Sequence, residues 1–192
     1  KSCDKVLGQS ESFVKVIEGK VKNKSKVEFF PSWAEDIFFN PEILYINKLE
    51  KFKNNFIILF TGNIGEAQDF QSILLCSKIL KNYKKIKFLI VGDGRKKEWL
   101  IKKIKSMDLE ENIYTLGQYD IKYMPTFHHF SSVLLITLKD SKFFSSTIPA
   151  KLQTYLISGK PIVGMINGEA SKIIKKSKSG LVCDAGNYKQ LS

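Results

Sequence analysis

Arginine is almost absent from this strongly basic chain. Of its 31 basic residues only Arg95 is an arginine, while the formal net charge is +12. Arginine is the side chain that reads base edges and grips phosphates as a two-pronged donor, so specific nucleic-acid recognition is not expected. The high lysine content indicates an ordinary solvated surface. Contact of basic patches with anionic lipid headgroups at a membrane is the functional alternative.

Cysteine and histidine are also scarce. Cys3, Cys76 and Cys183 are odd in number, far apart and form no CxxC pair, which argues against a disulfide framework and a structural zinc site. The two histidines, His128 and His129, are adjacent, and we interpret them as packing or surface residues. The sequence therefore predicts no metal site and a reducing, cytoplasmic compartment.

Long apolar runs and the common catalytic motifs are missing as well. No apolar run approaches the roughly 20 residues of a membrane-spanning helix. The chain begins at Lys1 without an initiator methionine or a signal peptide pattern, so we expect it to be cut from a longer protein. It contains no G-x-S-x-G, Walker or H-E-x-x-H motif, and Lys97 occupies the last glycine position of a G-x-G-x-x-G fingerprint at Gly92, which disfavours a dehydrogenase.

The most informative stretch present is residues 55–68, an uninterrupted apolar run that ends in a glycine-bracketed turn. The run lacks apolar–polar alternation, as expected of a parallel strand buried on both faces. Gly62 and Gly65 allow a sharp turn and the close approach of a ligand to the backbone. We expect a helix from about Glu66, whose free N–H groups and dipole would favour a phosphate at the turn.

From residue 55 onward, apolar strands alternate with helical patterns. Strands are predicted at 55–61, 86–91, 112–116, 133–136, 161–164 and 181–183, with helices at about 66–80, 97–105, 149–157, 170–175 and from 188. A turn-rich piece is expected at 118–130. This order predicts an α/β fold, a doubly wound parallel sheet of Rossmann-like type with ligands at the carboxyl ends of its strands.

The first 54 residues do not form a complete domain by this reading. Residues 1–30 contain two short strands and one helix, too little to bury a core, so we interpret them as the tail of a preceding N-terminal domain. Residues 31–54 are a linker. Residues 55–192 form the Rossmann-like domain, which we expect to be truncated at its C-terminal end.

A second informative stretch runs from Ser145 to Pro161. Pro149 suits the first turn of a helix, and Ser146 or Thr147 can cap it. Lys151 and Thr154, three residues apart, share the polar face of that helix. Two helix N-termini that suit anions, one after the first strand and one after the fourth, predict a ligand that carries a diphosphate.

Five motifs in order resemble one family. They are Phe60–Gln68, Val91–Gly94, Ser146–Lys151, Ser158–Val163 and Gly168–Ala170. Together they resemble the C-terminal, donor-binding domain of retaining glycosyltransferases of the GT-B fold, family 4, over about residue 32 to the end. Within that family the chain most resembles WbuB-type enzymes, which transfer N-acetyl-L-fucosamine in O-antigen assembly.

The resemblance implies a set of site residues. The glycine turn that would hold the donor diphosphate corresponds to Gly62, Asn63, Ile64 and Gly65. Asn63 stands where many members carry a basic residue, so Lys151 is the candidate for the missing charge. The family's two glutamates, which hold the donor sugar and the ribose, fall on Ser146 and Thr154, and Thr147 lies beside the first. The nucleobase would lie at Gln118 and Tyr119.

The implied activity is transfer of a sugar from a nucleotide-sugar donor, UDP-linked, to a lipid-linked saccharide in lipopolysaccharide biosynthesis. The resemblance implies an enzyme that uses no metal and no cofactor besides the nucleotide-sugar donor. Because the acceptor site and part of the catalytic groups belong to the N-terminal domain, we expect this chain to bind donor without turnover, in the cytoplasm or peripherally at the inner face of the membrane.

The sequence leaves two alternative functions open. A flavodoxin-like module that binds a phosphate-bearing ligand would need acidic residues after the first and third strands, where Gly62 and Leu116 stand. A GT-B-fold epimerase acting on UDP-sugars would need carboxylates in the cleft, and Ser146 and Thr154 disfavour it.

Overall fold

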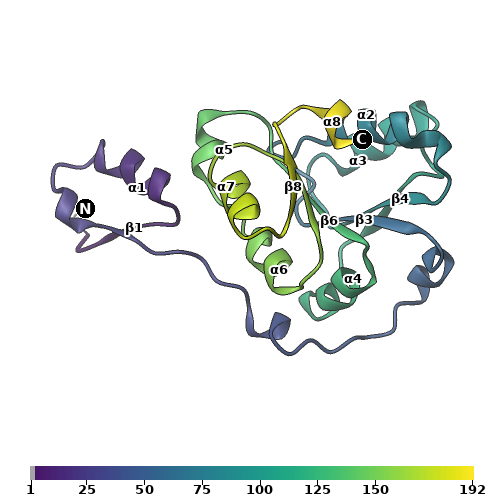
Figure 1. Ribbon diagram of the computed structural model, residues 1–192, viewed down its shortest axis with the longest axis horizontal. Helices are drawn as coiled ribbons and strands as arrows, with labels where there is room; N and C mark the ends of the chain where they lie inside the picture. The colour runs from purple at the N-terminus through teal and green to yellow at the C-terminus, as the bar shows by residue number, and fades with distance from the viewer. Residues whose placement is uncertain (1–2) are drawn as a thin grey trace.

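The chain forms a small N-terminal unit and a larger α/β domain, described here from a computed structural model of residues 3–192 (Figure 1). The strands are β1 Val6–Gly8, β2 Val27–Phe29, β3 Phe56–Thr61, β4 Ile86–Val91, β5 Ile113–Gly117, β6 Val133–Thr137, β7 Ile162–Met165 and β8 Gly180–Cys183. The α-helices are α1 Glu11–Glu18, α2 Phe70–Ile79, α3 Lys97–Ser106, α4 Met124–Phe130, α5 Lys142–Ser146, α6 Lys151–Ile157, α7 Gly168–Lys176 and α8 Tyr188–Leu191. Short 3-10 turns are η1 Lys24–Lys26, η2 Asp36–Phe38, η3 Asn47–Phe52, η4 Leu80–Asn82 and η5 Ile121–Tyr123.

Strands β3 to β8 build a six-stranded, fully parallel sheet in the order β5-β4-β3-β6-β7-β8. From β3 the chain adds β4 and β5 on one side of the sheet and then crosses to add β6, β7 and β8 on the other. The sheet is therefore doubly wound, and ligands are expected at the carboxyl ends of β3 and β6. The predicted fold class is therefore confirmed. Within residues 3–192, no helix is long and apolar enough to cross a membrane.

Strand β3 is buried on both faces, as its uninterrupted apolar run predicts. Ile57 and Leu59 pack into one core with α4, α6, α7 and η3, while Phe60 packs into the other with α2 and α3. Figure 1 shows α4 and α6 on one side of the sheet and α2, α3 and α8 on the other. Two helical layers covering a parallel sheet remove its apolar faces from water, which is the main source of its stability.

The N-terminal unit consists of β1, α1 and β2, with β1 parallel to β2. It touches the α/β domain through α1. The Ser10 hydroxyl accepts the Phe13 amide as the helix cap and donates to the Ser146 carbonyl at 2.5 Å, and Ser12 donates to Glu169 at 2.7 Å. The division of the chain at residues 30 and 54 remains a prediction.

Three sequence expectations about helices are wrong. The helix expected from Glu66 begins at Phe70, because the Asp69 carboxylate caps it by accepting the Ser72 amide. The region 118–130, expected to be turns, contains α4, whose second residue Pro125 suits a first helical turn. Helix α6, Lys151–Ile157, lies within the expected range 149–157, but no side chain caps it, although Ser146 or Thr147 was expected to do so.

The side chain that fixes α6 on β3 is Tyr155, which is fully buried. Its hydroxyl accepts the Thr61 amide at 3.0 Å and lies 3.1 Å from the Thr61 hydroxyl, so it completes the hydrogen bonding at the end of β3.

We predict that Tyr155→Phe lowers the free energy of unfolding by about 1–3 kcal/mol, because it leaves the buried Thr61 amide without an acceptor. Urea denaturation measures this change. Tyr83→Phe, at a side chain that is 63% exposed, is the control and should leave stability unchanged. Equal stabilities of the two variants would contradict the anchoring role of Tyr155.

Candidate functional site

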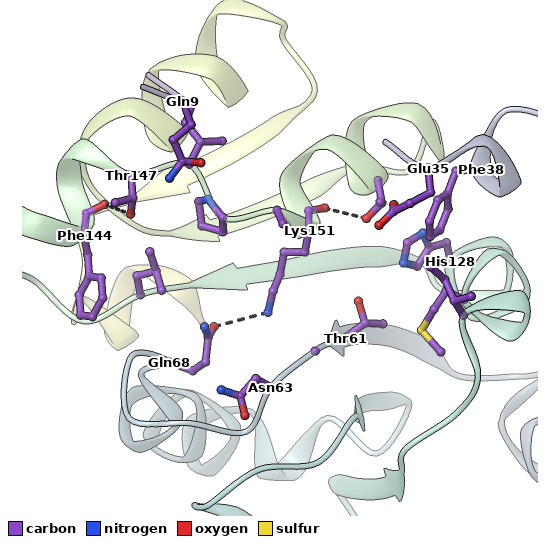
Figure 2. A pocket seen from close by; sticks show the side chains of 18 of the residues that line it. Gln9, Glu35, Phe38, Thr61, Asn63, Gln68, His128, Phe144, Thr147 and Lys151 are labelled. Carbon is purple, nitrogen blue, oxygen red and sulfur yellow. Dashed lines mark hydrogen bonds between the residues drawn. The ribbon is translucent and has the colours of Figure 1, made fainter. Parts of the chain in front are cut away.

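A cavity of about 630 Å³ opens at the carboxyl ends of β3 and β6 (Figure 2). Helix α6 contributes Lys151 and Thr154, the end of β3 contributes Thr61, Gly62 and Asn63, and the segment before α6 contributes Thr147. The part of the chain before β3 adds Gln9, Glu35 and Phe38. The cavity therefore lies where the strand order of a doubly wound sheet places ligands.

Lys151 points into the middle of this cavity (Figure 2). Its ammonium lies 3.6 Å from the centre of the Phe60 ring and 3.5 Å from the Gln68 Oε1 atom. It also approaches the Gly62 backbone so closely that a Cβ at Gly62 would lie 3.2 Å from Nζ. The predicted juxtaposition of Lys151 with the glycine turn is thus present in the structure.

The Lys151 ammonium has no counterion, since no carboxylate of residues 3–192 lies within 4 Å of it. Burial lowers the pKa of Lys151 from 10.5 to about 7. A positive charge taken out of water without a counterion is unfavourable, and an anion in the cavity would stabilise the charged form.

The turn after β3 is shaped by two glycines. Gly62 has φ +125°, and a Cβ on Gly92, at φ +143°, would lie 1.9 Å from the Gly62 carbonyl oxygen. The amide of Gly62 donates to the Val91 carbonyl. The neighbouring strand loop therefore packs against the turn so tightly that only glycine fits.

The predicted diphosphate residues divide into two groups. Gly62, Asn63 and Lys151 line the cavity. Ile64 is fully buried and its amide donates to the Asp93 carbonyl at 2.8 Å, so it presents no free donor to a ligand. Gly65 lies outside the cavity lining, with the Asn63 side chain against it.

The residues that follow α5 also differ from the expectation. The Ser146 hydroxyl donates backward to the Phe143 carbonyl and the Thr147 hydroxyl to the Phe144 carbonyl, so both end α5 and neither caps α6. Ser146 is 8% exposed and does not line the cavity. Thr147 does, as does Thr154, whose hydroxyl donates to the Lys151 carbonyl at 2.9 Å.

Gln118 and Tyr119, the predicted nucleobase residues, line a second cavity of about 350 Å³. Gly62, Asn63 and Met124 line both cavities, so the two adjoin at the end of β3. A ligand with a base in the smaller cavity and a diphosphate at Lys151 would pass along the glycine turn.

Sequence reasoning missed Gln9, Glu35, Phe38 and His128 as lining residues. His128 is 2% exposed, stacks on Phe38 with ring centres 5.4 Å apart, and burial lowers its pKa to about 4. Neither of its ring nitrogens has a partner among residues 3–192. A signal for Gln9 was present, because it directly follows the short parallel strand β1.

No group of three or more histidine, cysteine or acidic side chains within residues 3–192 is placed to hold a metal ion. The cavity at the strand switch point is lined by the Lys151 ammonium, the Glu35 carboxylate, hydroxyls and amides. That arrangement suits an anionic, hydroxyl-rich ligand.

Curated relatives are glycosyltransferases. The chain is 24% identical over 131 residues to 2-deoxystreptamine N-acetyl-D-glucosaminyltransferase of Niallia circulans, covering 68% of this chain and 32% of the relative. It is 30% identical over 125 residues to an uncharacterized glycosyltransferase of Methanocaldococcus jannaschii, covering 61% of this chain and 30% of the relative. The chain thus spans about a third of the length of these relatives.

Solved structures share the fold. HepE of Anabaena in complex with UDP-glucose superposes with a TM-score of 0.80 at 13% identity, covering 100% of this chain and 52% of that one. A TarM mutant of S. aureus, in a complex that includes UDP, gives 0.76 at 16% identity, covering 98% and 35%. The family model "Glycosyl transferases group 1" matches residues 42–192, which include the whole α/β domain and the segment directly before it. The chain therefore belongs to the group 1 glycosyl transferase family.

Proposed function

We propose that this chain is the donor-binding part of a retaining glycosyltransferase and that its donor is a UDP-linked sugar. Structural neighbours include complexes with UDP and with UDP-glucose, which supports a uridine nucleotide. In this proposal residues 55–192 bind the donor, residues 31–54 link the domains, and residues 1–30 belong to the N-terminal domain.

The observation that carries the proposal is the unpaired ammonium of Lys151 beside the Gly62 backbone. Asn63 supplies no charge at the turn, so Lys151 is the positive side chain available to a diphosphate in the cavity. When the bond between the sugar and the diphosphate breaks, negative charge develops on the departing phosphate oxygen. A preorganised ammonium in a partly dehydrated site stabilises that charge.

The other roles follow from position. Gln118 and Tyr119 would bind the base in the adjoining cavity, and Thr147 and Thr154 would hydrogen-bond sugar hydroxyls. Ile64 and Gly65 would act through the shape of the turn. Ser146, buried behind the cavity, would hold Thr147 in place rather than touch the sugar.

We propose an N-acetylated amino sugar as the transferred group, with N-acetyl-L-fucosamine as the specific candidate and a lipid-linked saccharide of O-antigen assembly as the acceptor. Support comes from the N-acetylglucosaminyl transfer in the name of the Niallia circulans relative and from the pneumococcal O-GlcNAc transferase solved with UDP and GlcNAc. The lysine-rich surface suits a position at the cytoplasmic face of the membrane.

Lys151→Ala should weaken UDP binding by about 10- to 100-fold, because a charge-assisted contact to phosphate contributes about 1.5–3 kcal/mol. Binding of uridine should change little, since it has no phosphate. Isothermal titration calorimetry without added metal measures both. Lys160→Ala is the matched control, a half-buried lysine beyond the other end of α6. Equal UDP affinities of wild type and Lys151→Ala would contradict the proposal.

Lys151→Met should stabilise the ligand-free protein by about 0.5–2 kcal/mol, because it removes an unpaired, partly buried charge. The same variant should lose the rise in melting temperature that UDP gives wild type. Thermal denaturation at pH 6, where Lys151 is charged, measures both effects. A ligand-free variant less stable than wild type would mean that the ammonium serves the fold rather than a ligand.

A further inference from the structure

The linker residue Glu35 brings a negative charge to the large cavity. It lies immediately before η2 and lines the cavity together with His128 and Thr154. Its carboxylate has no hydrogen bond or ion pair with any other residue in the described range 3–192, and it does not cap η2. Among the charged side chains of the cavity lining, Lys151 is the cation and Glu35 the anion.

Packing on both sides of Glu35 fixes its place, although its own side chain is exposed. Ala34 and Phe38 are each 7% exposed, and Phe38 stacks on His128 of α4. The linker is tied to α4 again by the Leu44 amide, which donates to the Thr126 hydroxyl at 2.8 Å. A carboxylate held between such anchors needs little ordering when a ligand binds.

Glu35 lies at one end of the cavity. Figure 2 shows Glu35, Phe38 and His128 on one side of Lys151, with Gln9, Phe144 and Thr147 on the other. His128 and Met124 are four residues apart on α4 and so share a helix face, and Met124 also borders the second cavity with Gln118 and Tyr119. Met124 therefore connects the α4 side of the large cavity to the second cavity, whose lining does not include Glu35 itself.

The chemistry of this end favours hydroxyl donors. A free carboxylate accepts hydrogen bonds and repels phosphate, so the diphosphate belongs at Lys151 and a neutral, hydroxyl-bearing group at Glu35. The pKa of His128 is lowered to about 4 by burial, so its imidazole is neutral near pH 7 and does not pair with the Glu35 charge.

We infer that Glu35 binds the ribose of the donor nucleotide, its carboxylate accepting hydrogen bonds from the 2′- and 3′-hydroxyls. In a nucleoside diphosphate the ribose is joined directly to the diphosphate, and Glu35 and Thr154 line the same cavity as Lys151. The enzymes that the chain resembles carry a ribose-binding glutamate at the position of Thr154, so here the linker supplies the charge that α6 lacks. This inference rests on the proposed function.

Isothermal titration calorimetry of the 192-residue chain with UDP and with 2′,3′-dideoxyuridine diphosphate tests the ribose role of Glu35. Wild type should bind UDP about tenfold or more tightly than the dideoxy compound, because the lost bonds are charge-assisted. Glu35→Gln, which keeps the side-chain shape, should reduce this ratio severalfold by weakening UDP alone. Asp36→Asn removes a neighbouring exposed charge outside the cavity and should keep the wild-type ratio.

Two results separate this inference from the function on which it rests. If wild type and Glu35→Gln show the same ratio while UDP still binds in a Lys151-dependent manner, the ribose role of Glu35 is wrong and the diphosphate site stands. If wild type binds neither nucleotide, the donor-binding function fails and the ribose inference fails with it. Melting temperatures of Glu35→Gln and Asp36→Asn close to that of wild type would show that both variants are folded.

Discussion

Helix α6 contributes Tyr155 to the core and Lys151 to the cavity. The two residues are four positions apart, about one helical turn. Tyr155 fixes the helix on the sheet by accepting the Thr61 amide at the end of β3. Lys151, on the same helix face, is thereby held over Phe60 and against Gly62. The ammonium is thus placed by the same packing that buries Tyr155, and it stays uncompensated because no acidic side chain of the described residues reaches it.

The cavity around Lys151 is completed by residues from outside the α/β domain. Gln9 follows β1, and Glu35 stands at the start of the linker turn η2. Ser10 couples the N-terminal unit to the segment before α6, since its hydroxyl both caps α1 and donates to the Ser146 carbonyl. A movement of the N-terminal unit would therefore change the shape of the cavity at its Gln9 end.

The parts of the structure that the sequence could predict are those set by local pattern. The uninterrupted apolar run of β3 and the alternation after it lead to a doubly wound sheet, and the ligand rule for such sheets brings Gly62 and Lys151 together. Hydroxyl capping was misjudged at Ser146, because a serine can equally accept an amide at a helix start or donate to a carbonyl at a helix end. The same amino-acid sequence is compatible with both hydrogen-bonding geometries.

The residues that could not be predicted are those placed by tertiary packing. Glu35 lies 119 positions before Thr154 in an extended segment without periodicity, and stacking of Phe38 on His128 decides where the linker runs. His128 gave no signal because its burial depends on that same linker. Contacts of this kind bring the Glu35 carboxylate to the cavity from an extended segment between two structured parts of the chain.

The pKa of the Lys151 ammonium, followed by NMR of its labelled Cε and Nζ atoms, tests the central claim most directly. In the free protein we expect a pKa of about 7. On saturation with UDP the pKa should rise toward 10.5, since a diphosphate stabilises the charged form. A pKa that stays the same in the free and the UDP-saturated protein would contradict the account.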